Sequence, residues 1–224
     1  MLANRPSAQS EPLVLIIPGL NDSGPEHWQT WWQRELPHAE RVELGMWDDP
    51  HRNTWVNQLN LAIHNVSKHW AGRPVILVAH SLACHVVSWW AEYERPEPDG
   101  PVKAALLVAP PEVEHDAVDP RLARFAPVMP RALPFPSILA ASRDDPWIDF
   151  GRARRLARIW KSRFVDAGWL GHINADSGVR DWPFGQFLLR QLNAAIEPLN
   201  QPLVRGRNYA TLIEQTGRAP AAAW

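Results

Sequence analysis

The sequence predicts an α/β fold in which a mostly parallel sheet is doubly wound, with helices on both of its faces. Segments with the pattern of strands alternate along the chain with segments that have the period of helices. Each strand segment is a nearly continuous apolar run, which is typical of a parallel sheet covered on both faces. With 224 residues, 46% of them hydrophobic, the chain is long enough for one domain with a substantial core.

Short apolar runs predict six strands. The first covers residues 13–17 and ends at Pro18-Gly19, which indicates a tight turn. The third, residues 75–79, is expected to be the most buried. The other strands are predicted over residues 42–44, 102–109, 137–141 and 163–166.

Apolar residues at helical spacing predict the helices between these strands. The first helix is expected to start at residues 23–26, where Ser23 would cap it and the Glu26 carboxylate would reach back to the cap. Asn53 or Thr54 is expected to cap the second. Further helices are predicted over residues 82–93, 150–160 and 183–196, and the proline-rich residues 110–136 fit no element.

No repeat or linker divides the chain. We expect a flexible leader over residues 1–11, the α/β domain over residues 12–197, and a tail of unknown role over residues 198–224. Because little length remains beyond the sheet and its helices, a large lid domain is not expected.

Charge and cysteine content exclude several classes of function. The 23 basic and 24 acidic residues nearly cancel, so the net charge of −1 offers nothing to nucleic acid or to an anionic membrane. The single cysteine, Cys84, permits no intramolecular disulfide and no zinc site of paired thiols. His64 and His69 diverge on a helix, so no metal site is predicted. With a polar start and no run of about 18 apolar residues, the chain is expected to be cytoplasmic.

The most informative segment leads from the third strand into a serine. The strand runs through His80 into Ser81, and a helix follows at once, which is the setting of a nucleophile elbow. Such a turn strains the serine backbone and needs small residues two before and two after it. Ala79 and Ala83 meet that need where glycine is usual. The alternative is that Ser81 only caps the helix.

A nucleophilic serine needs a general base, and the base needs a carboxylate that fixes its tautomer. Around a nucleophile elbow, the acid and then the histidine follow the serine in the chain. Of the histidines after Ser81, His85 lies on the helix of the elbow and His115 precedes the later strands. His172, on a loop past the last strand, is therefore the predicted base.

The acid is expected in the loop after residues 137–141. Asp145 is preferred because Pro146 keeps it extended and outside the next helix. Asp144 is the direct rival, and Asp149 is expected to cap that helix.

Two backbone amides are expected to hold the oxyanion that forms during acyl transfer. One belongs to Leu82, at the start of a helix, and the other to Leu20, where Gly19 lets the backbone approach. Asn21, in the same turn, is a candidate for the substrate pocket. These positions all follow predicted strands, at the edge where open parallel sheets bind ligands.

Tryptophan makes up 13 of the 21 aromatic residues. Trp147 lies two residues after Asp145, and Trp169 lies three before His172, so both are candidates for aromatic walls of the pocket, with ordinary loop packing as the alternative. The tryptophans expected to pack against the sheet are Trp28, Trp31, Trp32, Trp55, Trp89 and Trp90.

These segments resemble the α/β-hydrolase superfamily, and within it the small serine hydrolases related to retinoblastoma-binding protein 9 and their bacterial homologues. The resemblance rests on residues 18–28 (PGLNDSGPEHW), on Ala79-His80-Ser81-Leu82, on residues 142–146 (SRDDP) and on residues 171–174 (GHIN). It implies a serine hydrolase that uses Ser81, Asp145 and His172, needs no metal or cofactor, and has poorly defined natural substrates. Our first hypothesis is that it cleaves a small carboxylic ester, or an amide, through an acyl-enzyme on Ser81. A binding protein with a vestigial triad on the same scaffold is the alternative, and no protein partner is inferred.

Overall fold

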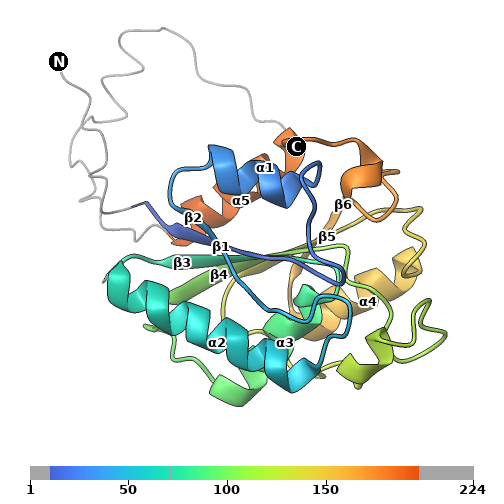
Figure 1. Cartoon of the computed structure of the whole chain (residues 1–224), viewed down its shortest axis with the longest axis horizontal. Helices are drawn as coiled ribbons and strands as arrows, with labels where there is room; N and C mark the ends of the chain where they lie inside the picture. The colour runs from blue at the N-terminus through green and yellow to red at the C-terminus, as the bar shows by residue number, and fades with distance from the viewer. Residues whose placement is uncertain (1–10, 71, 197–224) are drawn as a thin grey trace, which may run out of the picture.

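The computed structural model describes residues 11–70 and 72–196, which form a parallel six-stranded sheet flanked by helices (Figure 1). The strand order is β2-β1-β3-β4-β5-β6, so the chain moves from β1 out to the edge at β2, returns to β3 on the other side of β1, and then continues through β4 and β5 to the far edge at β6. The strands are β1 (Leu13–Ile17), β2 (Ala39–Arg41), β3 (Val75–His80), β4 (Val102–Val108), β5 (Ser137–Ala141) and β6 (Arg163–Asp166).

Helices cover both faces of the sheet, which confirms the predicted fold class. On one face lie α1 (Trp28–Glu35) and α5 (Pro183–Ile196). The other face carries α2 (Arg52–His69), α3 (Ala83–Glu94) and α4 (Phe150–Trp160) (Figure 1). Two short 3-10 helices, η1 (Leu122–Phe125) and η2 (Ala175–Ser177), lie in the connections.

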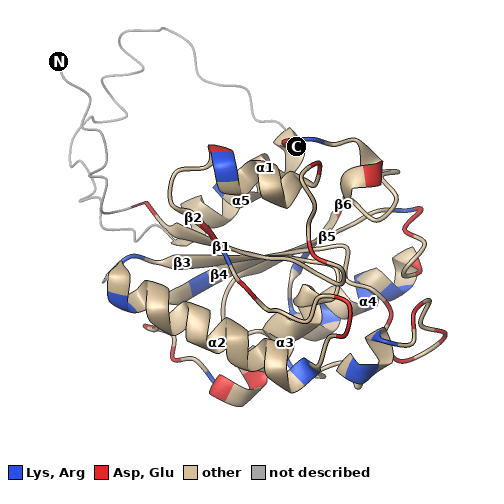
Figure 2. Cartoon of the chain, viewed as in Figure 1, with Lys and Arg blue, Asp and Glu red and all other residues tan. Residues whose placement is uncertain are grey.

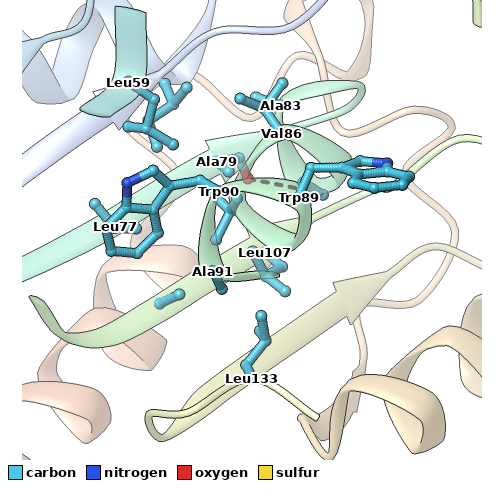
Figure 3. Close-up of a cluster of buried hydrophobic side chains, with 14 of the residues drawn as sticks. Leu59, Leu77, Ala79, Ala83, Val86, Trp89, Trp90, Ala91, Leu107 and Leu133 are labelled. Carbon is cyan, nitrogen blue, oxygen red and sulfur yellow. Dashed lines mark hydrogen bonds between the residues drawn. The ribbon is translucent and has the colours of Figure 1, made fainter. Parts of the chain in front are cut away.

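The sheet divides the hydrophobic core in two because successive strand residues face opposite sides. In β1, Leu13 and Leu15 join the cluster under α2, α3 and α4, whereas Val14 joins the cluster with Trp28 of α1. Figure 3 shows the larger cluster around α3, where Trp89 and Trp90 lie among small and branched apolar side chains. The packing role predicted for the helical tryptophans is confirmed for those that are buried, which are Trp28, Trp32, Trp55, Trp89 and Trp90. Trp31 is half-buried.

The bounds of β5, α4, β6 and α5 are those that the sequence predicts. The second strand is different, because β2 pairs with β1 through residues 39–41 and not 42–44. Val42 and Leu44 are buried, but they pack against the core just beyond the strand. The Val42 amide still donates to the Ile16 carbonyl at 2.8 Å, so the observed strand lies just before the predicted one in the chain and its pairing with β1 ends at Val42.

The start of the first helix also differs from the prediction. His27 is the N-cap of α1, and its side chain accepts a hydrogen bond from the amide of Gln29. The Ser23 hydroxyl donates instead to the Gln29 side chain, 2.7 Å away. Likewise, α2 begins at Arg52, after His51 and before the predicted caps.

The proline-rich residues 110–136 form irregular loops around η1 and no separate domain. Their buried side chains, including Val113, Leu122 and Phe125, extend the core on the α2, α3 and α4 face. No large lid covers the described residues, as predicted.

Charged residues of both signs lie interspersed on helices and loops (Figure 2). Between residues 11 and 196, residue 71 left aside, none of the helices combines the length and the apolar character needed to cross a bilayer.

Candidate active site

Three side chains predicted to act together lie at the carboxyl-terminal edge of the sheet. Ser81 follows β3, Asp145 follows β5, and His172 follows β6. Because all strands are parallel, these three loops emerge at the same edge.

The backbone of Ser81 has the strain expected of an elbow. Its φ of +55° lies in the left-handed region, which residues other than glycine rarely adopt. Ala79 and Ala83 are fully buried where strand and helix pass each other, so the alanines leave enough room for the turn. The Ser81 side chain does not cap α3, since the N-cap position is Leu82 and no side-chain cap bond is present there.

A continuous row of hydrogen bonds joins Ser81, His172 and Asp145. Nδ1 of His172 lies 2.9 and 3.0 Å from the two carboxylate oxygens of Asp145, and its Nε2 lies 2.8 Å from Oγ of Ser81. Because a carboxylate only accepts, Nδ1 donates to Asp145, which leaves Nε2 to accept from the Ser81 hydroxyl. All three residues are buried. The arrangement suits removal of the hydroxyl proton by His172.

The rival residues lie elsewhere. Asp144 accepts hydrogen bonds from the Ser142 hydroxyl at 2.6 Å and the Gly171 amide at 2.9 Å, and these bonds hold the pKa of its carboxyl below the usual value. Asp144 thus ties together the two loops that carry Asp145 and His172. Asp149 caps α4, as predicted, by accepting from the amides of Gly151 and Arg152.

The two other histidines after Ser81 make their contacts with other residues. His85 is buried in α3, where Nε2 donates to the carbonyl of Pro111. His115 is exposed on the loop after β4.

The turn after β1 lies directly against the elbow. A Cβ atom placed on Gly19 would be 2.8 Å from Cβ of Ser81 and 3.3 Å from the Leu82 amide nitrogen. The amides of Leu20 and Leu82 donate to no acceptor within the described ranges. Two unused donors therefore lie on loops that meet at Ser81, which is the arrangement that stabilises an oxyanion.

A cavity of about 230 Å³ opens over the serine. Trp147 forms part of its wall and stacks on the His172 ring, with ring centroids 5.2 Å apart. Asn21 also lines the cavity, and its side-chain oxygen accepts from Arg121. The residues around the cavity are Leu20, Asn21, Asp22, Gly24, His27, His80, Ser81, Trp147, His172, Asn174 and Ala175.

Trp169 does not line this cavity, which corrects its prediction as a pocket wall. Its side chain is 69% exposed and lies beside the Arg143 guanidinium. Gly168, at φ +84°, turns the chain just before it. Closeness in sequence to His172 therefore did not bring the side chain to the site.

Two histidines in the cavity wall were not singled out from the sequence. His80 donates from Nε2 to the backbone carbonyl of His172 at 2.9 Å, so the elbow holds the loop of the predicted base. Burial, above all, holds the pKa of His80 well below its ordinary value. Its position directly before Ser81 was a signal that could have identified it. The ring of His27 packs edge-on against that of His80, with centroids 4.7 Å apart.

One group of acidic and histidine side chains between residues 11 and 196 comes close enough to share a cation. Ligand atoms of Glu112, Glu114 and His115 lie within 4.8 Å of one another, away from the cavity at Ser81. The Glu112 carboxylate already accepts from Arg152 and from two backbone amides. Since these bonds occupy the carboxylate, we assign the cluster no ligand.

The parallel sheet, the strained serine after β3, and the acid and histidine on later loops define an α/β hydrolase fold. The chain belongs to the serine hydrolase family, whose model matches residues 14–191. The finer resemblance to relatives of retinoblastoma-binding protein 9 stays a prediction.

Solved structures of similar fold include other hydrolases. A YdeN-like hydrolase from Pectobacterium atrosepticum is 32% identical, with a TM-score of 0.66 over 83% of this chain and 92% of that one. The ydeN gene product of B. subtilis is 21% identical, with a TM-score of 0.65 over 82% and 100%. The esterase domain of a Rhodothermus marinus protein is 17% identical, with a TM-score of 0.56 over 83% and 90%. The comparison with curated proteins found no match.

Proposed function

We propose that this hydrolase cleaves small carboxylic esters, or amides, through an acyl-enzyme on Ser81. The observation that carries the proposal is the row of hydrogen bonds from Asp145 through His172 to Ser81. That row ends at a strained serine beside two unused backbone amides. A packing or capping serine has no need of this combination.

The proposed reaction has two similar halves. Nε2 of His172 takes the hydroxyl proton while Oγ of Ser81 bonds to the substrate carbonyl carbon. The carbonyl π electrons move onto oxygen, where the amides of Leu20 and Leu82 donate to the negative charge. His172 then gives its proton to the leaving alcohol or amine as the bond to the acyl carbon breaks.

Water completes the cycle in the same geometry. His172 deprotonates the water as it attacks the acyl carbon, and the acid leaves when Oγ of Ser81 recovers a proton from His172. The Asp145 carboxylate holds the imidazole in the required tautomer and stabilises its protonated form in both halves.

Two features support a small substrate in a reducing compartment. The cavity of about 230 Å³ is smaller than the roughly 300–1,000 Å³ of sites that enclose drug-sized ligands. The chain has a single cysteine, Cys84, which is buried and free, so no internal disulfide calls for an oxidising compartment, and we place the protein in the cytoplasm.

A fluorophosphonate probe tests the proposal because it reacts with an activated serine and not with an ordinary one. We expect covalent labelling of the wild type and none of Ser81→Ala, with the labelled peptide located by mass spectrometry. Thermal unfolding of both proteins checks that they are folded. A folded wild type that stays unlabelled would contradict the proposal and favour a binding protein with a vestigial triad.

A further inference from the structure

The cavity wall contains an imidazole that the proposed chemistry does not use. His27 lines the cavity together with Ser81 and His172. As the N-cap of α1, its Nδ1 accepts a hydrogen bond from the amide of Gln29 at 3.2 Å. A nitrogen that accepts carries no hydrogen, so in the neutral ring the hydrogen is on Nε2. The cap therefore makes His27 a donor on the side away from the helix.

That donor has no partner in the described part of the chain. Nε2 of His27 is buried and makes no hydrogen bond to any described residue. Buried polar groups are nearly always hydrogen-bonded, and one without a partner calls for a ligand or a water. Because the same ring forms part of the cavity wall, a small turn of the ring would bring Nε2 to an acceptor placed in the cavity.

The ring stays neutral over the physiological pH range. Burial lowers the pKa of His27 to about 3, helped by the nearby His172 and by Arg41. His27 is therefore a neutral donor and not a cation that would attract a carboxylate. The one carboxylate in the wall, Asp22, is ion-paired with Arg41, so it leaves no unpaired charge to attract a cationic substrate.

We propose that His27 is a specificity-determining residue that donates from Nε2 to a neutral oxygen of the substrate. The substrate class is a small ester whose acyl or alcohol part carries an ether, hydroxyl or carbonyl oxygen beyond the scissile group. This inference rests on the proposed hydrolysis at Ser81. An ester with only hydrocarbon in that position leaves the buried donor unpaired and is hydrolysed less well.

Two substitutions separate the donor of His27 from its cap. In His27→Asn, the amide oxygen takes the place of Nδ1 and keeps the cap, because asparagine is among the best N-cap residues, but nothing reaches the position of Nε2. In His27→Gln, the longer amide puts an N–H near the position of Nε2 and gives up the cap. A role limited to capping therefore predicts that His27→Gln is the more damaged variant.

The experiment compares esters that differ only by oxygen in place of a methylene group. Nitrophenyl methoxyacetate and nitrophenyl butyrate test the acyl side, and methoxyethyl acetate and butyl acetate test the alcohol side. For each pair the ratio of kcat/KM values is measured in the wild type, His27→Asn and His27→Gln. Dividing the ratio for each variant by the ratio for the wild type cancels the difference in intrinsic reactivity between the two esters. Urea unfolding measures separately how much stability the loss of the helix cap costs.

We expect the preference for the oxygen-bearing ester, in at least one pair, to fall about threefold to tenfold in His27→Asn, the size of one neutral hydrogen bond. His27→Gln should retain that preference although it unfolds at lower urea concentration. Unchanged ratios in His27→Asn, or an equal fall in both variants, would overturn the inference while leaving hydrolysis at Ser81 intact. A folded wild type inactive on all the esters would overturn this inference, and failure of fluorophosphonate labelling would overturn the proposed function as well.

Discussion

Gly19 approaches Ser81 so closely that no side chain fits between them. A Cβ atom on Gly19 would lie 2.8 Å from Cβ of Ser81 and 2.9 Å from the carbonyl oxygen of His80, distances that real Cβ atoms essentially never show. The contact brings the Leu20 amide to the elbow. Gly19→Ala should therefore separate the two proposed oxyanion donors.

We expect Gly19→Ala to lower kcat by about 10²–10³-fold, the usual cost of losing one oxyanion donor. Steady-state kinetics on a nitrophenyl ester measures this loss, and circular dichroism checks the fold. Gly24→Ala adds a methyl group in the wall of the cavity at Ser81, where nothing lies within 4 Å of a Cβ, so it shows whether an added methyl group alone lowers kcat. Full activity in Gly19→Ala would argue against an oxyanion site at Leu20.

Asp145 and Asp144 are adjacent in sequence but have different partners. Asp145→Asn should reduce kcat by on the order of 10³–10⁴-fold, because an amide facing Nδ1 of His172 favours the wrong tautomer of the ring. Asp144→Asn should act mainly on stability, since Asp144 binds the Ser142 hydroxyl and the Gly171 amide. Parallel measurement of kcat and of the free energy of unfolding distinguishes the two, and a larger kcat loss in Asp144→Asn would contradict the assignment.

Trp147 and Trp169 form a matched pair for testing the cavity wall. Trp147→Ala removes the ring that stacks on His172 and lines the cavity, so kcat/KM for small esters should fall, by about twofold to tenfold if one aromatic contact of 0.5–1.5 kcal/mol is lost. Trp169→Ala should leave kcat/KM near the wild-type value, because its side chain is exposed beside Arg143. Equal losses in the two variants would mean that the cavity extends to Trp169.

Much of the fold and of the candidate site could be predicted because the residue types along each segment favour the same local structure that the tertiary fold requires. The strand that runs into Ser81, and the loops that carry Asp145 and His172, are defined by short-range patterns and by the order of the chain. The same holds for α4, where Asp149 is the cap in both sequence and structure.

The features that were missed depend on contacts between distant segments. Val42 is apolar because it packs on the core, and no local pattern separates that burial from strand pairing. His27 caps α1 in place of Ser23 because the Ser23 hydroxyl turns to the Gln29 side chain. The two loop tryptophans could not be told apart because the direction of each side chain depends on the path of its loop.

A final prediction concerns acid stability and the buried His85. Burial lowers the pKa of His85 to about 4 from its ordinary value of 6.5, against the opposing effects of its bond to Pro111 and of Glu112 and Glu114. Below pH 6.5 the unfolded chain binds a proton that the folded chain does not accept. The free energy of unfolding should therefore fall as the pH drops from 6.5 to 4, by about 1.4 kcal/mol per pH unit from this residue.

The variant His85→Gln tests this because it removes the titrating group while its amide N–H can still donate to the Pro111 carbonyl, which accepts from His85 at 2.9 Å. Urea unfolding at a series of pH values should give a shallower slope below pH 6.5 in His85→Gln than in the wild type. His115→Gln, at a side chain 70% exposed, controls for the loss of a histidine at the surface. If His85→Gln and the wild type lose stability in parallel as the pH falls, His85 is not the buried neutral group that couples folding to pH.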